Sequence, residues 1–370
     1  MHEFRQRRFG VRVLRNAIVA LSPIFFAALV PPASATAADN MLTYRGTDRE
    51  QKLIAGAKQE GAVVLYSAMI ENQVLRPIAD AFQKKYPFIH MTYWRGDAGD
   101  IVARLSAEVR SKRVVADVAE GTDLGELGTT AHILQPYYVP EIEKYPAFER
   151  DPHGMWTPTR LSYFSIAYNT KLVPPGQEPK SFQDLLDPKW KGKMVWRVGT
   201  STGAPLFITN LRVAWGEARA LAYFQKLKDQ QIVNYGSGSA RTLVDRTLAG
   251  EYSIALNIFA HHPLISKAQG AHVDSKLMDP VAVTAATMGV PIGAHHPNAA
   301  MLLVDFILSV EGQQIVARAQ YFPARPDVPP LPELASVIPS NAHVPENFIS
   351  SDKLLQYTPS SQKIFQDLFR

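Results

Sequence analysis

Apolar and polar positions follow two alternating patterns along the first third of the chain. Apolar residues at helical spacing cover 49–59, 71–87 and 98–112. Each of these segments leads into a short apolar run typical of a buried strand, and the three runs read GAVVLYSA, FIHMTYWRG and VVADVAEG. Helices that alternate with buried strands in this way predict a parallel sheet with helices on both faces.

A second unit of the same kind follows a stretch rich in proline. The pattern predicts a long strand over 160–169, and apolar runs resume at KMVWRV and YSIALNIF. Residues 284–294 are predicted to form a strand that returns to the first unit, and residues 298–319 one amphipathic helix. The tail after Pro323 is expected to end in a short helix over 360–369.

Two such units joined by two crossing strands predict an α/β protein with two lobes. We expect residues 38–160 and 284–330 to form lobe 1 and residues 161–283 to form lobe 2. Residues 331–370 are expected to be a C-terminal tail that packs back on the lobes. Ligands bind beyond the carboxyl ends of strands in open parallel sheets, and clefts between domains are favoured sites, so we expect the site there.

The first 37 residues have the pattern of a secretory signal peptide. Five arginines precede an apolar stretch from about Ala17 to Val30, and the small residues Ala35 and Ala37 mark candidate cleavage points. The apolar stretch is interrupted by Pro23 and is shorter than the roughly 20 residues that a membrane span needs. We therefore expect an exported protein that is not itself embedded in a membrane.

Composition removes several classes of function. The leader holds five Arg and one Glu, so the formal net charge of +5 falls to +1 without it, with 34 basic and 33 acidic residues. A nucleic-acid partner would require a basic surface, so none is expected. The chain has no cysteine, which excludes thiol catalysis and zinc or iron–sulfur sites built on cysteine.

The stretch VGTSTGAP suggests two different chemistries. Gly199 to Gly203 match the G-x-S-x-G pattern of a hydrolase nucleophile elbow. Such an enzyme would also need an acid and then a histidine downstream of Ser201. The candidates in that order are Asp245, Asp274, Asp279, His295 and His296. A change of lobe just before Ser201 argues against a hydrolase, which needs several strands of one sheet ahead of its nucleophile.

The same strand–turn–helix context predicts an anion cradle. The N–H groups of Thr202, Gly203 and Ala204 would point from a first helical turn, where the helix dipole favours an anion. The hydroxyls of Ser201 and Thr202 add donors. In the alternative, Ser201 or Thr202 simply caps its own helix. A second turn, with Ser237 and Ser239, raises the same choice.

Arginines and histidines at predicted strand ends are further candidates. Arg95 could bind a carboxylate or phosphate through both arms of its guanidinium, or form an ion pair with Asp97, and Arg160 poses the same alternatives. The pairs His261-His262 and 295–296 could each send one ring to the cleft. Neighbouring residues of a strand face opposite sides, so neither pair predicts a metal site, and solvated loop histidines are the commoner outcome.

Several stretches together resemble the periplasmic substrate-binding proteins of ABC importers. The similarity is to the family 1 solute-binding group that includes ferric-ion-binding proteins. It is carried by EGAVVLYSA, ADVAEGTD, YNTKLVPPGQEPKSFQDLLDPKWKGKM, LVDRTLAGEYSIAL and YFPARPDV, over about residues 50–328. The resemblance implies a type II binding-protein fold in the periplasm, a monomer that delivers its ligand to an inner-membrane permease, and neither catalysis nor a cofactor.

The resemblance also bears on the ligand. Iron-binding members of the group use an adjacent tyrosine pair, and here Ala260 and His261, or His261 and His262, stand at those positions. Ferric iron prefers anionic oxygen, which imidazole replaces poorly. We therefore expect a small anionic organic ligand, a carboxylate or a phosphorylated metabolite, and no metal. A ferric-iron-binding protein of the same fold is the alternative.

The family's anion-holding turn falls on Thr202 to Ala204, with support expected around Ser237 to Ser239 and from Asn257. The expected ligand-binding residues are Ser67, Ala68, Arg95, Gly96, Thr122, Arg160, Ser201, Thr202, Gly203, Ala204, Ser237, Ser239, Asn257, His261 and Tyr321.

Overall fold

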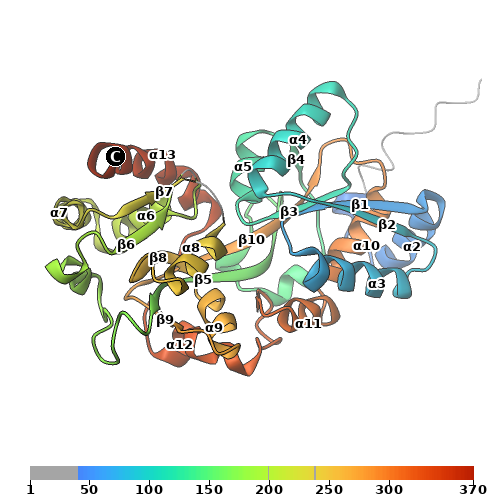
Figure 1. Ribbon diagram of the computed structural model, residues 1–370. Coiled ribbons are helices and arrows are strands. Elements are labelled where there is room, and N and C mark those ends of the chain that lie inside the picture. The colour runs from blue at the N-terminus through green and yellow to red at the C-terminus, as the bar shows by residue number, and fades with distance from the viewer. Residues whose placement is uncertain (1–40, 199, 237–238) are drawn as a thin grey trace, which may run out of the picture. The chain divides into compact units, whose positions relative to one another are not determined.

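The computed structural model describes residues 41–198, 200–236 and 239–370 (Figure 1). The predicted signal peptide lies outside these residues, as do Gly199 and Ser237. The described chain is α/β, as the alternating pattern predicts, and its strands form one twelve-stranded sheet.

Eight strands form the path of this sheet, in the order β2–β1–β3–β10–β5–β8–β6–β7. Their bounds are β1 Ala62–Ser67, β2 His90–Arg95, β3 Val118–Gly121, β5 Thr157–Asn169, β6 Met194–Arg197, β7 Val233–Tyr235, β8 Ile254–Phe259 and β10 Val281–Pro291. Four short strands pair at the sides: β4 (Leu134–Gln135) and β12 (Glu346–Phe348) with β10, and β9 (Val273–Lys276) and β11 (Phe322–Pro323) with β5.

The strands β5 and β10 join the two lobes. They pair with each other in antiparallel fashion. In addition, β10 pairs with β3 of lobe 1, and β5 pairs with β8 of lobe 2. Every residue of β10 is buried, which explains why its sequence does not alternate and is apolar except at Thr284 and Thr287. The parallel strands β1, β2 and β3 belong to lobe 1, and β6, β7 and β8 to lobe 2.

Helices cover both faces of the lobe 1 strands (Figure 1). One face carries α2 (Arg49–Glu60), α3 (Arg76–Lys85) and α10 (Pro297–Leu308), and the other carries α4 (Ala98–Ser111) and α5 (Leu124–Thr130). Separate clusters of buried apolar side chains lie beneath the two sets. Phe82 and Phe306 belong to the first cluster, and Ile101 and Leu105 to the second. Burial of these faces supplies the main driving force for folding.

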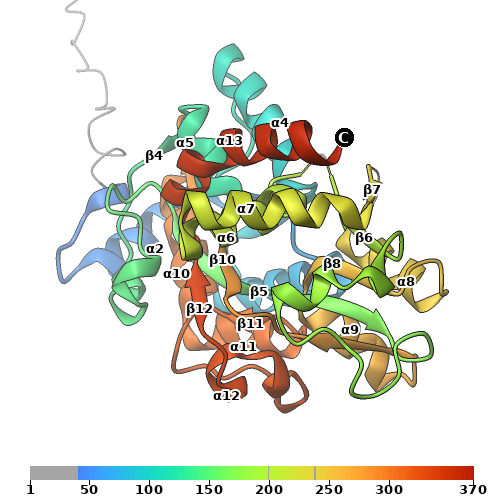
Figure 2. The same ribbon diagram turned by 90° about the vertical axis from the view of Figure 1, so that its left-hand side faces the viewer.

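Lobe 2 is built in the same way (Figure 2). Three helices lie together on one side: α6 (Ala204–Trp215), α7 (Glu217–Leu227) and α13 (Ser351–Phe369). The other two helices of this lobe are α8 (Ala240–Leu248) and α9 (His261–Ala268). Trp196 of β6 is fully buried and packs edge-on against Phe207 of α6 and against Phe365 and Phe369 of α13. The end of the chain is thus part of the lobe 2 core.

Two helix predictions are wrong in their bounds. The helix expected over 298–319 is two helices, α10 and α11 (Val310–Arg318), bent by 61° at a break where Ser309 accepts a hydrogen bond from the Gly312 N–H at 3.3 Å. The helix expected over 360–369 is the longer α13, which begins at Ser351. Within the described residues, no single helix is long and apolar enough to span a membrane, and only the bent α10–α11 pair passes that test by length and composition.

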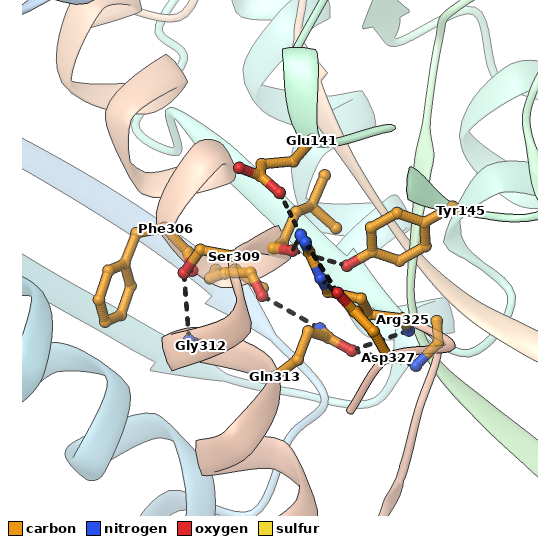
Figure 3. A network of polar contacts seen from close by, with 11 residues as sticks. Glu141, Tyr145, Phe306, Ser309, Gly312, Gln313, Arg325 and Asp327 are labelled. Atoms are coloured by element: carbon orange, nitrogen blue, oxygen red, sulfur yellow. Dashed lines mark hydrogen bonds and ion pairs between the residues drawn. The ribbon is translucent and has the colours of Figure 1, made fainter. Parts of the chain in front are cut away.

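A buried polar network fixes the segment after α11 to lobe 1 (Figure 3). The Gln313 side chain donates to the Thr159 carbonyl at 2.9 Å and accepts from the Ala324 N–H at 3.0 Å. The Arg325 guanidinium is paired with Glu141 and, at 2.7 Å, with Asp327. These contacts hold β11 against β5 and thereby set the position of the neighbouring Tyr321.

Candidate functional site

The lobe 1 strands end along one edge of the sheet. β1 pairs in parallel with both β2 and β3, in a register that places Ser67 beside Arg95 and Glu120. The Gly96 N–H donates to the Ser67 carbonyl and the Ala68 N–H donates to the Glu120 carbonyl, both at 3.1 Å. Polar strand ends therefore meet at this edge, as the sequence predicts.

The buried carboxylate of Glu120 organises this edge. It accepts hydrogen bonds from the Ser67 hydroxyl at 2.6 Å and the Thr159 hydroxyl at 3.2 Å, and it forms an ion pair with Arg160. The Arg160 guanidinium also lies 5.1 Å from the centre of the Tyr321 ring. The charge of Arg160 is thus matched within the protein, which is the ion-pair alternative raised from the sequence.

Arg95 also forms an ion pair within the protein. Its guanidinium lies 3.5 Å from the Asp97 carboxylate, and both side chains are exposed. Exposed pairs of this length are worth little, so Arg95 can exchange this partner for another anion. Thr122, the next predicted residue, directly follows β3.

The turn after β6 has fewer available N–H donors than predicted. The Thr202 N–H donates to the Thr200 hydroxyl at 3.2 Å, and the Gly203 N–H donates to the Thr200 carbonyl at 3.4 Å. Pro205, in the first turn of α6, has no N–H to offer. Among the described residues, the Ala204 N–H alone of the three predicted donors has no acceptor.

The backbone at this turn is closely packed. A side chain at Gly203 would place its Cβ 2.3 Å from the Arg197 carbonyl oxygen, so only glycine fits. The Asn257 amide donates to the carbonyls of Thr202 and Gly203 at 2.8 and 3.1 Å. Asn257, predicted to contact the ligand, therefore supports the turn that carries Ser201.

The Ser201 hydroxyl is directed across to lobe 1. It donates a hydrogen bond to the carboxylate of Asp123, the second residue after the end of β3. Burial raises the pKa of Asp123, while the Ser201 hydrogen bond and the charge of Arg197 act in the opposite direction. The prediction of an open anion cradle is thus incomplete, because the protein places a carboxyl group of its own at this turn.

Arg197, the last residue of β6, lies beside this turn. Burial lowers the pKa of its guanidinium, and Asp123 and Asp97 partly offset that shift. The Arg197 Nε and the Asp123 Oδ1 are both buried, and neither has a hydrogen-bond partner among the described residues. Such unpaired polar atoms are costly unless a ligand or water satisfies them.

In the second donor-rich turn, Ser239 caps its own helix, which is one of the two alternatives raised from the sequence. Its hydroxyl accepts from the Thr242 N–H at 3.3 Å and so caps α8. Arg241, in the first turn of α8, is paired with Asp245 at 3.0 Å and donates to the His262 carbonyl at 3.3 Å.

The histidines His261 and His262 lie in a helix and are largely enclosed, whereas the sequence suggests a solvated loop. Both residues lie in the first turn of α9, with ring centroids 4.5 Å apart, and His261 is only 4 % exposed. Burial and the neighbouring arginines hold the pKa of His261 well below its usual value and lower the pKa of His262 to about 3. The Nδ1 atoms of both rings have no partner among the described residues.

His261 is part of a contact between three elements. Its ring centroid lies 5.5 Å from that of Tyr321, and Tyr321 in turn faces Arg160. The fold thus brings together three predicted residues that are 60 to 161 positions apart in the sequence.

The geometry gives no support to a serine hydrolase. The Ser201 hydroxyl meets Asp123, which precedes it in the chain, instead of a histidine. Of the downstream candidates, His296 binds Asp117 through Nδ1 at 2.8 Å, and Asp245 and Asp274 pair with Arg241 and Lys267. A triad needs its base within hydrogen-bond reach of the nucleophile.

The described residues hold no cluster of three or more His, Asp or Glu side chains arranged to bind a metal ion.

A cavity of about 580 Å³ is lined by residues from Gly176 to Trp190, a stretch that precedes β6 in the chain. Its lining includes none of the expected ligand-binding residues.

Asp123, Arg197 and Glu120 are residues of this site that the sequence did not identify, and His262 was considered only as a neighbour of His261. Asp123 and Arg197 lie at or just beyond the carboxyl ends of predicted strands, and that position is the signal that could have identified them.

Two α/β lobes, joined by crossing strands and with polar strand ends at their junction, define a type II periplasmic binding protein. The chain belongs to the bacterial extracellular solute-binding proteins, whose family model matches residues 122–349. It is a periplasmic substrate-binding protein of ABC transport, as the resemblance implies.

Individual relatives differ in the ligand for which they are named. Iron uptake protein A1 of Synechocystis is 27% identical over 63% of this chain and 68% of its own length. A putative 2-aminoethylphosphonate-binding periplasmic protein of Salmonella typhi is 25% identical over 69% of this chain and 75% of its own. The structure of the periplasmic binding protein AfuA from Actinobacillus pleuropneumoniae, with fructose-6-phosphate bound, has a TM-score of 0.68 at 22% identity and covers 84% of this chain and 99% of that one.

Proposed function

We propose that the protein captures a small anionic organic molecule, a carboxylate or a phosphorylated metabolite, between its two lobes. It then delivers this ligand to an inner-membrane permease, acts as a monomer after removal of its signal peptide, and catalyses no reaction. Lobe closure around the ligand would bend β5 and β10, the strands that connect the lobes.

The proposal rests mainly on one observation, which is that Arg197 is largely buried and has no acidic partner among the described residues. The guanidinium is largely buried, its Nε has no partner, and no carboxylate lies within ion-pair distance of it among the described residues. Arg95, Arg160 and Arg241, by contrast, are each paired with an acid. A buried cation without an internal partner is stabilised when an anionic ligand supplies one.

Neighbouring groups of lobe 2 add further donors. His261 and His262 are held neutral by burial, and their unpaired Nδ1 atoms can donate to an oxyanion. The Ala204 N–H at the start of α6 adds a backbone donor. Relatives named for a phosphonate and a structure with a bound sugar phosphate are consistent with such a ligand.

The residues proposed to touch the ligand follow from these contacts. Arg160 and Asn257 serve as supports, because Glu120 and the turn carbonyls use their polar groups. The proposed contacts are Ser67, Ala68, Arg95, Gly96, Thr122, Arg197, Ser201, Thr202, Gly203, Ala204, Ser239, His261, His262 and Tyr321. Ser237, the remaining residue expected from the sequence, lies outside the described residues.

The first test is native mass spectrometry of the gently purified exported protein, with a denatured sample as control. We expect a reproducible mass excess that matches an organic anion and is lost on denaturation. An excess that matches ferric iron would overturn the proposal, and an adduct on Ser201 that survives denaturation would indicate a hydrolase.

A variant then tests the site. Arg197→Gln should weaken binding of the identified anion about 10- to 100-fold, because it removes a charge-assisted hydrogen bond. Arg110→Gln, which changes an exposed arginine of α4, should leave the affinity unchanged. Equal affinity of both variants would contradict the assignment of Arg197.

A further inference from the structure

A carboxyl group faces the proposed anion site from the other lobe. Asp123 extends from the end of β3 to the turn after β6, where Ser201 donates to its Oδ2. Its Oδ1 is buried and has no partner among the described residues. A ligand with only negative charge would bring that charge against this group, which would oppose binding.

Asp123 differs in this respect from the other acid of the edge. Glu120 uses its oxygens on Ser67, Thr159 and Arg160, so it has little capacity left for a ligand. Asp123 and Arg197 are near enough for each to shift the pKa of the other, yet no ion pair joins them among the described residues. The site thus presents one unused acceptor from lobe 1 and one unused donor from lobe 2.

A second buried acid adjoins Asp123. Glu126, in the first turn of α5, is 6 % exposed, and its Oε2 also has no partner among the described residues. Two unsatisfied carboxyl groups therefore lie on the lobe 1 side, and Arg197 with the two histidine rings on the lobe 2 side. This arrangement, with unsatisfied acceptors on one side and unsatisfied donors on the other, matches a molecule that carries both an amine and an oxyanion.

We propose that the ligand bears a cationic amine in addition to its anionic group, and that Asp123 is the residue that receives the amine. Arg197, the α6 turn and the histidine pair hold the phosphate, phosphonate or carboxylate end, while the ammonium donates to Asp123 Oδ1. This inference rests on the proposed function, since it divides the same site into an anionic and a cationic end.

Matched pairs of compounds test the inference by titration calorimetry. The pairs are propylphosphonate and 2-aminoethylphosphonate, succinate and aspartate, and glucose 6-phosphate and glucosamine 6-phosphate. The protein is first freed of copurified ligand by unfolding, dialysis and refolding. In each pair that binds, the compound with the amine should bind at least about tenfold tighter, as expected for a charge-assisted hydrogen bond.

Asp123→Asn provides the matched variant, because asparagine keeps an acceptor for Ser201 and removes the charge. It should reduce the preference for the amine to less than about threefold, whereas Asp100→Asn, which changes an exposed acid of α4, should preserve the preference. The comparison in the native protein stands even if the Asp123 variant does not fold.

The outcomes separate the two proposals. If the compounds without the amine bind as tightly as their partners, the inference about Asp123 is wrong and the proposed capture of anions still stands. If none of the six compounds binds the native protein, the proposed function fails for these classes of anion and the inference fails with it.

Discussion

The hydroxyl of Ser201, on the turn after β6, donates a hydrogen bond to the carboxylate of Asp123, at the end of β3. The two residues are 78 positions apart and belong to different lobes. This contact connects the proposed anion site to lobe 1 and places a protein carboxyl group where the sequence alone suggests an open cradle.

Loss of the Ser201 hydroxyl should destabilise the protein through Asp123. Ser201→Ala leaves the buried carboxyl group without its donor, and we expect the free energy of unfolding to fall by about 1–3 kcal/mol. In an Asp123→Ala background the same substitution should change it by less than about 0.5 kcal/mol, because the partner is already absent. Urea unfolding of the four proteins measures both values, and an equal loss in both backgrounds would show that the two residues are not coupled.

Burial of Glu126 should make stability depend on pH. Burial raises the pKa of Glu126 to about 8, from 4.5 in the unfolded chain. Between these values the folded state binds the proton more tightly than the unfolded state, so the free energy of unfolding falls as the pH rises from 4.5 to 8. Glu126→Gln should remove this loss and be more stable than the native protein at pH 8, by about 1–3 kcal/mol.

The control for this experiment is Glu333→Gln, which changes an exposed acid far along the chain. Thermal unfolding of all three proteins at several pH values from 5 to 8 checks the prediction. Parallel curves for the native protein and Glu126→Gln would rule out a contribution of Glu126 in this range.

His262 should make the free energy of unfolding depend on pH in the opposite direction, at acidic pH. The pKa of His262 is lowered to about 3, so the unfolded chain binds a proton between about pH 3 and 6.5 that the folded state does not. The contribution of His262 to the free energy of unfolding should therefore fall as the pH drops below 6.5, with a slope that approaches one proton, and it opposes the contribution of Glu126 over the shared range. His262→Asn should lessen this slope by up to about 1.4 kcal/mol per pH unit, as measured by urea unfolding at pH 4.5, 5.5 and 6.5.

A matched control is His343→Asn, which changes an exposed residue after α12 (Pro339–Ala342). The control should keep the slope of the native protein. If His262→Asn also kept that slope, the ring of His262 would have to be charged in the folded protein.

The order of strands and helices could be predicted because each element has its own local pattern. The apolar run at Ala62–Ser67 and the helical spacing over Arg49–Glu60 depend on neighbours in the sequence, and both elements form where expected. The break at Ser309 could not be predicted in this way, because the apolar spacing of α10 continues across it into the amphipathic α11. A single serine cap is a weak signal within such a run.

The site was harder to predict than the fold because its contacts join distant segments. The sequence identifies Ser201 as a residue of a turn, but only tertiary packing brings Asp123 to its hydroxyl. Burial of His261 likewise depends on Tyr321 and Phe322 of the segment after α11, whose rings pack against it. Local reasoning therefore leads to an exposed loop histidine where the structure has a buried one.

Gly203 should be the least replaceable glycine of the α6 turn. A Cβ at this position would lie 2.3 Å from the Arg197 carbonyl oxygen, so Gly203→Ala must displace the end of β6 or the start of α6. We expect the free energy of unfolding to fall by about 1–3 kcal/mol and the affinity for the captured anion to fall with it, because Arg197 and Ala204 both move. Gly99→Ala is the matched control: its Cβ would meet nothing within 4 Å, and alanine in this first turn of α4 should not lower the free energy of unfolding. Urea unfolding and calorimetry of both variants decide the matter, and a Gly203→Ala protein with native stability and affinity would show that the turn tolerates movement and does not hold the ligand.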